Sequence, residues 1–308
     1  MSEPQNWERQ TLEKLAFAGM QEQRRARHWS IFFKTLGFVY LFALLFIALD
    51  WIGPSKTIGS HTALIDLQGE IGAEGQVTAD NTLSSLQTAF EDKHTKGVIL
   101  RINSPGGSPV QAGIINDEIK RQRKLHPSIP VYAVVEDICA SGGYYIAVAA
   151  DKIYVDKASI VGSIGVIMDG FGFTGTMQKL GVERRVMTAG ENKALLDPYS
   201  PVNPAHKAFA QSLLNEVHQQ FIQVVREGRG KRLKETPEMF SGLFWTGQRS
   251  IELGLADGLG TSESVARDVI GEENIVDFTT HEGFADRFAK RFGASMANTL
   301  SSASVKLH

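Results

Sequence analysis

The longest apolar run of the chain lies near its start and predicts one membrane-spanning helix. It extends from Ile31 to Ile52 and reads IFFKTLGFVYLFALLFIALDWI, with Lys34 and Asp50 as its only charged residues. At about 1.5 Å per residue, such a helix crosses a hydrocarbon core of roughly 30 Å. We expect a signal anchor over residues 29–52, because no small-residue cleavage site follows the run.

Basic residues beside this run predict its orientation. Arg24, Arg25 and Arg27 precede it, and Lys34 lies near its start. The positive-inside rule therefore places residues 1–28 in the cytoplasm and the bulk of the chain on the other side of the inner (cytoplasmic) membrane, in the periplasm.

After an expected linker over residues 53–60, strand-like and helix-like patterns alternate up to residue 272. Such alternation is typical of an α/β domain with a largely parallel sheet, here residues 61–272. The predicted strands are Ala63–Leu67, Gly97–Asn103, Val131–Glu136, Lys152–Val155 and Val182–Thr188. The predicted helices are Asn81–Lys93 with Asp80 as its cap, Val110–Leu125, Gly142–Ala150 and Ala205–Glu227.

The last stretch, residues 273–308, is expected to be an extension with a basic amphipathic helix. Phe284, Phe288 and Phe292 recur at helical spacing and alternate with basic residues such as Arg287. Such a helix could contact the membrane, a neighbouring subunit or its own domain.

Composition narrows the function classes. The net charge is −2 and the charges are mixed along the chain, so the composition does not indicate a nucleic-acid-binding protein. Cys139 is the single cysteine, so an intramolecular disulfide is excluded. We find no metal-binding spacing, phosphate-binding loop or dinucleotide fingerprint, and expect no cofactor and no metal.

Two glycine-rich turns follow predicted strands and carry candidate chemistry. The first is Ser104-Pro105-Gly106-Gly107, and the second begins with Ser141-Gly142. Glycines there let backbone N–H groups approach a ligand, including the oxyanion of a tetrahedral intermediate. From the residues alone, Ser141 is either a nucleophile at the entrance of a helix or a plain N-cap.

A nucleophilic serine needs a base, and the histidines offer none in a strand-end or glycine-rich motif. Lys193 is the alternative, since an uncharged lysine can accept a proton, although most loop lysines are simply solvated. Ser163, between Gly162 and Gly165, could bind such a lysine or its own backbone. Cys139 lies in a predicted strand and is expected to be a small core residue.

Five segments taken in order resemble the signal peptide peptidase A (protease IV) family of serine peptidases. They read NSPGGS, ASGGYYIAVAADKIYV, SIVGSIGV, GENKALLDPYSP and TGQRSIELGLADGLG. The resemblance covers about residues 63–270 and also the N-terminal anchor. It implies an α/β fold of the crotonase/Clp-protease-like type, a spiral of ββα units.

The resemblance also implies roles for single residues. Ser141 matches the family's nucleophile, Lys193 its general base and Ser163 the serine that binds this lysine. Gly107 and Gly142 match the oxyanion donors, although the sequence does not separate Gly107 from its neighbour Gly106. Short members of the family form rings in which a neighbouring subunit supplies the lysine.

The expected function is therefore that of a membrane-bound serine endopeptidase with a Ser–Lys dyad. Its expected substrates are cleaved signal peptides or other short membrane-proximal peptides, and its expected partners are the lipid bilayer and further copies of the chain. Two alternatives stay open: a non-catalytic membrane scaffold of the same fold, and a peptidase for the quality control of specific membrane proteins.

Overall fold

The computed structural model describes residues 4–48 and 59–280, which belong to two separate compact units. The first unit contains α1, a single helix over Pro4–Ala48 whose side chains are exposed from residue 9 to residue 46. By length and composition α1 can cross a membrane, as the sequence predicts. The end of the expected anchor, residues 53–58 of the linker and the expected helix with Phe284, Phe288 and Phe292 lie outside the described residues.

The helix α1 is longer than the predicted anchor. It continues without interruption through residues 4–28, which the sequence analysis treats only as a cytoplasmic segment. Within residues 4–28, the one glycine, Gly19, lowers helix stability by about 1 kcal/mol relative to alanine, and the residues around it are mostly good helix formers.

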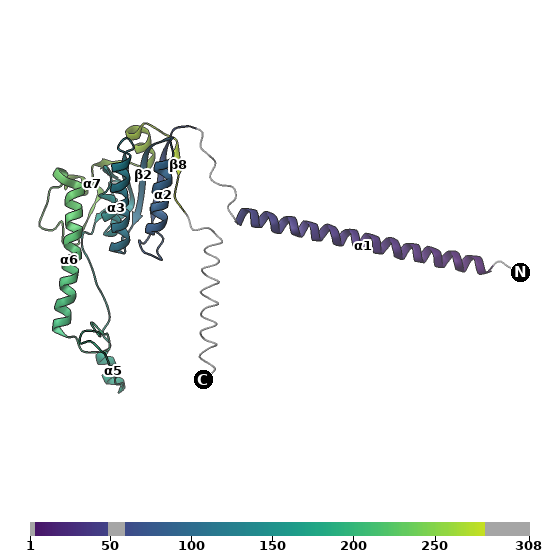
Figure 1. Ribbon diagram of the computed structural model, residues 1–308, viewed down its shortest axis with the longest axis horizontal. Coiled ribbons are helices and arrows are strands. Elements are labelled where there is room, and N and C mark those ends of the chain that lie inside the picture. Colours follow the sequence, from purple (N-terminus) through teal and green to yellow (C-terminus); the bar gives the residue numbers. More distant parts are fainter. Residues whose placement is uncertain (1–3, 49–58, 281–308) are drawn as a thin grey trace. The chain divides into compact units, whose positions relative to one another are not determined.

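The second unit is built on one sheet (Figure 1). Its strand pairs are parallel except for the antiparallel pair β5–β6. Its strands are β1 (His61–Gln68), β2 (Thr95–Ser104), β3 (Val131–Ala140), β4 (Lys152–Val155), β5 (Ile160–Gly162), β6 (Phe244–Thr246), β7 (Gly258–Leu259) and β8 (Ile275–Asp277). The order along the main path is β6-β5-β3-β2-β1-β8. The predicted parallel α/β architecture is confirmed.

The sheet forks at β3, and the fork creates the site described below. The first half of β3 pairs with β4, which continues to β7, while its last residues pair with β5. In this second branch Ala140 lies opposite Gly162. Because the two strands are parallel, Ser141 and Ser163 leave the sheet side by side.

Helices α2 (Ala79–Glu91) and α3 (Pro109–Leu125) lie side by side along the sheet (Figure 1). The short helix α4 (Gly142–Ala147) packs on α3. The remaining helices are α5 (Thr174–Leu180), α6 (Pro204–Arg229), α7 (Gly247–Glu252) and α8 (Ser262–Ser264), with a 3-10 turn at Gly230–Arg232 and a π turn at Val265–Ile270. The cap of α2 is Thr78, whose hydroxyl accepts from the Asn81 N–H, so the predicted cap Asp80 is wrong.

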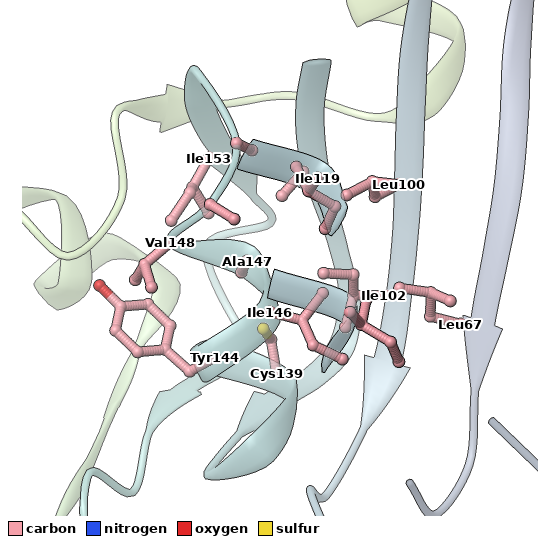
Figure 2. Packing of buried hydrophobic residues seen from close by; sticks show 14 of the residues in the cluster. Leu67, Leu100, Ile102, Ile119, Cys139, Tyr144, Ile146, Ala147, Val148 and Ile153 are labelled. Atoms are coloured by element: carbon pink, nitrogen blue, oxygen red, sulfur yellow. The ribbon is translucent and has the colours of Figure 1, made fainter. Parts of the chain in front are cut away.

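The core lies between the sheet and these helices. Figure 2 shows Leu100 and Ile102 from β2 packed with Ile119 from α3 and with Ile146 from α4. Cys139 is fully buried in the same cluster, as expected for a small core residue. Burial raises the pKa of its thiol, which removes it as a nucleophile.

A buried ion pair fastens α6 to the sheet. Arg229 is 1% exposed, and its guanidinium donates to both carboxylate oxygens of Asp257 at 2.8 and 3.0 Å. Burial by itself would raise the pKa of Asp257, but the hydrogen bonds and charge of Arg229 outweigh it and hold that pKa below its usual value. Asp257 also accepts from the Ile153 N–H on β4.

One predicted strand is wrong. Residues 182–188 form no strand and are all exposed. They belong to a projecting segment, residues 166–203, which we call the arm and which also contains α5. A short segment with apolar residues forms a stable strand only where another strand pairs with it, and the sheet provides no partner for residues 182–188.

Candidate active site

Ser141 occupies the sharp turn between β3 and α4 in a strained backbone conformation. Its φ and ψ are +51° and −120°, a backbone region that residues other than glycine rarely adopt. Its N–H donates to the Gly162 carbonyl at 2.9 Å, and its carbonyl accepts from the Tyr145 N–H. Its hydroxyl makes no capping hydrogen bond to the helix, so Ser141 is not a plain N-cap.

The glycines beside Ser141 allow a close approach of backbone segments. A Cβ on Gly106 would lie 2.7 Å from the Ser141 Cβ and 2.8 Å from the Gly142 nitrogen. A Cβ on Gly142 would lie 3.3 Å from the Gly107 nitrogen. The two glycine-rich turns of the sequence therefore meet at Ser141.

The backbone of the first turn leaves the Gly107 N–H available. On either side of it, the Gly106 carbonyl accepts from the Ile71 N–H at 2.9 Å, and the Ser108 N–H donates to the Ile71 carbonyl at 2.8 Å. Successive residues of an extended chain point in opposite directions, so the polar groups of Gly107 point away from Ile71. Within residues 4–48 and 59–280, the N–H groups of Gly107 and Gly142 donate to no other residue.

The neighbouring Gly106 differs in this respect. Its N–H donates to the Ser104 hydroxyl at 3.1 Å. Geometry therefore separates the two glycines that the sequence leaves equivalent, because only Gly107 keeps a free donor beside Ser141.

Ser163 lies next to Ser141 at the end of β5. It also has a positive φ of +52°, and its N–H donates to the Leu243 carbonyl at 2.8 Å. The side chain is half-buried. The structure thus brings Ser141, Ser163, Gly107 and Gly142 together from three separate segments of the sequence.

A histidine that sequence reasoning passed over lies near this cluster. The Nε2 of His218 on α6 is 3.2 Å from the carbonyl oxygen of Ile164, the residue after Ser163. One turn further along α6, the Phe221 ring packs on Tyr145 at 5.1 Å. The signal for His218 was its position on the apolar stripe of α6, three residues before Phe221 and seven before the buried Val225.

Lys193 does not join the cluster within this chain. It is exposed, in a run of turns on the arm, where its N–H donates to the Gly190 carbonyl. Its neighbour Asn192 is held 3.0 Å from the Nε2 of His206, in the first turn of α6. From His206 to His218 an α-helix rises roughly 18 Å, which separates Lys193 from the serines.

The arm has an exposed apolar surface. Within residues 165–209, all of which the structure describes, none is buried. Its large side chains are 72–98% exposed at Ile167, Phe171, Leu180, Met187 and Val202. Figure 1 shows α5 beside the N-terminal end of α6, away from the sheet. Apolar area of this kind marks an interaction surface.

The described residues contain no group of three or more His, Cys, Asp or Glu side chains arranged to hold a metal ion.

Tyr144, three residues after Ser141, is fully buried, and its hydroxyl donates to the Leu255 carbonyl at 2.8 Å. Burial raises its pKa, so it is a packing residue and not an acid or base of the site.

Comparison with known proteins agrees with this geometry. The model of "Peptidase family S49" matches residues 123–275. A protein of Synechocystis sp. that is named as a protease is 35% identical over 69% of this chain and 74% of its own length. A protein of Enterococcus faecium that is named as a signal peptide peptidase is 33% identical over 67% of this chain and 60% of its own length.

A third relative has a different name. A protein of Brucella abortus named as a Na⁺/H⁺ antiporter is 47% identical over 71% of this chain, but the match spans only 30% of that protein. The predicted crotonase/Clp-protease-like class is confirmed by the mostly parallel α/β sheet and by the family match. The chain belongs to peptidase family S49, the serine peptidases that include signal peptide peptidase A and protease IV.

Proposed function

We propose that this protein is a membrane-anchored serine endopeptidase in which Ser141 is the nucleophile and Lys193 the general base. The observation that carries the proposal is the strained turn at Ser141. It presents a hydroxyl without a capping hydrogen bond beside the free N–H groups of Gly107 and Gly142. Strain of this kind persists where the surrounding structure enforces it, often at a reacting group.

In the proposed reaction, the uncharged Nζ of Lys193 takes the proton of Ser141 while Oγ forms a bond to the peptide carbonyl carbon. The carbonyl electron pair moves to its oxygen, where the N–H groups of Gly107 and Gly142 hold the negative charge. Collapse of this intermediate breaks the C–N bond, and Lys193 returns the proton to the leaving amine. Water then hydrolyses the acyl-enzyme by the same steps.

We further propose that Lys193 acts in a neighbouring copy of the chain. It lies roughly 18 Å along α6 from the level of His218 in its own chain, on an arm whose apolar side chains are exposed. Docking of the arm on a second copy would cover this apolar surface and remove Lys193 from water. Ser163, beside Ser141, is then placed to accept a hydrogen bond from the lysine. Repetition of this head-to-tail contact would close a ring.

The proposed setting is the inner membrane, with residues 1–28 in the cytoplasm and the catalytic domain in the periplasm. The exposed apolar helix α1 and the basic residues before its apolar part support this topology. The proposed substrates are short apolar peptides near the membrane, above all cleaved signal peptides, in line with the name of the Enterococcus relative.

Subunit mixing tests the division of the dyad between copies. Ser141→Ala and Lys193→Ala are each expected to be inactive, but when co-expressed they should regain about a quarter of wild-type activity, because neighbouring subunits complement each other. Lys179→Ala, on the same arm, is the matched control and should stay active. If the mixture regains no activity, either Lys193 acts within its own chain or it is not the general base, and the proposed sharing between copies is refuted.

Labelling tests the reaction itself. A fluorophosphonate probe should modify Ser141 in the assembled protein, as located by peptide mass spectrometry, and the modification rate should rise with pH as the lysine loses its proton. A flat pH profile would contradict a lysine base.

One observation favours a second candidate, a non-catalytic membrane scaffold of the same fold. In the described part of the chain, no basic side chain forms a hydrogen bond with Ser141. A scaffold predicts no labelling of Ser141 even in the assembled protein. If labelling succeeds, capture of substrates in cells on a Ser141→Ala variant distinguishes signal-peptide degradation from quality control of particular membrane proteins.

A further inference from the structure

Ser104, the last residue of β2, lies behind the glycine turn and is completely buried. Its hydroxyl has two partners, both backbone groups. It donates to the Gly69 carbonyl at 2.6 Å and accepts from the Gly106 N–H at 3.1 Å. A buried hydroxyl with both functions satisfied fixes the segments that it joins, since breaking either bond leaves an unpaired buried group.

The first segment that it fixes begins at Gly69, after β1. The Gly69 N–H donates to the Asn103 carbonyl at 2.9 Å, so Gly69 is held through both its N–H and its carbonyl. Two residues later, Ile71 is bonded to Gly106 and to Ser108. The hydrogen bonds of Ser104 and Ile71 therefore hold the backbone on both sides of Gly107 and leave the Gly107 N–H unused.

The second segment is the start of α4. A Cβ on Gly143 would lie 3.1 Å from the Ser104 carbonyl oxygen and 3.4 Å from the Ser104 Cβ. The helix that carries Gly142 thus rests directly on Ser104. One buried serine contacts both backbone elements whose N–H groups face Ser141.

The glycine turn needs such support. Gly106 and Gly107 have φ values of +107° and +143°, which are open to glycine but enforced by no side chain of their own. Stabilisation of an oxyanion depends on donors whose directions are fixed before the reaction, so a turn free to rotate would lose most of this effect.

We infer that Ser104 is a positioning residue of this site: through the Gly106 N–H, its hydroxyl fixes the direction in which the Gly107 N–H meets the oxyanion. The inference rests on the proposed peptidase function. The partners of the Ser104 hydroxyl are the Gly69 carbonyl and the Gly106 N–H, so in this role it acts through the backbone of the turn.

The test compares Ser104→Ala with Ser159→Ala in the full-length, assembled protein. Ser159 is a close match, because it is 2% exposed, donates to the Glu136 carbonyl at 2.5 Å and accepts from the Asp156 N–H at 3.0 Å. It precedes β5, at the end of that strand away from Ser163. Both variants lose a buried hydroxyl that bridges two backbone groups, but only one loses it beside the turn.

We expect Ser104→Ala to lower kcat for a peptide substrate by about 10- to 100-fold with KM unchanged, since removing one oxyanion donor outright costs about 100- to 1,000-fold. Ser159→Ala should keep kcat within about threefold of wild type. Ser104→Cys, which keeps a side chain with a weaker donor and acceptor, should fold and show an intermediate kcat.

Hydrogen exchange provides a readout that does not depend on activity. Amide exchange of a peptide spanning Gly106 and Gly107 should become faster in Ser104→Ala and stay unchanged in Ser159→Ala. Equal losses of kcat in the two alanine variants, a change in KM alone, or wild-type kcat in Ser104→Cys would each overturn the inference. If wild type neither hydrolyses peptides nor reacts with the serine probe, the proposed function fails. Unchanged exchange in Ser104→Ala would instead refute the positioning role itself.

Discussion

The Ser141 end of the sheet and the arm that carries Lys193 are built in opposite ways. Around Ser141, parallel strands, positive-φ residues and glycines fix the backbone, and the residues behind the site are fully buried. On the arm no side chain is buried, and most large apolar residues face outward. One chain therefore holds the proposed nucleophile and oxyanion donors in a fixed backbone, while the proposed base lies on an exposed surface.

The largest effect on activity is expected at the Ser141 end of the sheet. Ser141→Ala should lower peptide hydrolysis by about 10⁴-fold or more, because it removes the proposed nucleophile. Initial rates with a fluorogenic peptide measure it, and Ser84→Ala, at an exposed serine of α2, is the control. Residual activity within tenfold of wild type would remove Ser141 from the reaction.

A large effect is also expected from the arm, although it lies far from Ser141 in the chain. Charges at two of its most exposed apolar positions, in the double variant Phe171→Asp and Met187→Asp, should prevent assembly and lower activity by about 100-fold or more. Light scattering measures the oligomer, and Gln178→Asp on the same arm is the control. Full assembly of the double variant would show that the arm does not form the contact.

A smaller effect on activity is expected at Ser163, where Lys193 of a neighbouring copy is proposed to bind. Ser163→Ala should reduce kcat by about tenfold, since the lysine would lose a hydrogen-bond partner but keep its position. The pH profile measured in parallel should shift if Ser163 contacts the lysine. An unchanged profile together with an unchanged kcat would restrict Ser163 to a backbone role.

The smallest effect on activity is expected at the junction of α6 with the sheet, where stability should change instead. Asp257→Asn leaves the buried Arg229 without its charged partner and should cost about 3 kcal/mol, a fall in melting temperature of roughly 6–12 °C. Thermal unfolding of the detergent-solubilised protein measures it, with Asp268→Asn as an exposed control paired to Arg267.

The pH dependence of this stabilisation follows from the lowered pKa of Asp257. Its contribution is complete above the unfolded-state pKa of about 3.9 and is lost as the pH falls through the lower folded-state pKa. The difference between wild type and Asp257→Asn should therefore be constant from pH 5 to 7 and shrink only below about pH 4. A difference that grew on acidification would contradict this assignment.

The elements predicted best are those with strong local signals. The predicted strand Lys152–Val155 has the observed bounds, and the predicted helix Val110–Leu125 differs only by Pro109. The strand predicted at residues 182–188 failed because its apolar residues, Val182, Val186 and Met187, lie exposed on the arm. A short apolar stretch alone does not tell whether its partner is a neighbouring strand or another molecule.

The sequence by itself determined the apolar N-terminal helix, the parallel α/β class and the two glycine turns, because periodicity, length and backbone freedom are local properties. Only the tertiary structure decided that Ser141 and Ser163 leave adjacent strands together, and that Gly107 rather than Gly106 keeps a free N–H. It also showed that Ser104 lies behind the glycine turn, that His218 lies beside Ile164, the residue after Ser163, and that Lys193 lies away from the serines. These facts depend on strand pairing and on contacts between residues up to 54 positions apart, which no local pattern encodes.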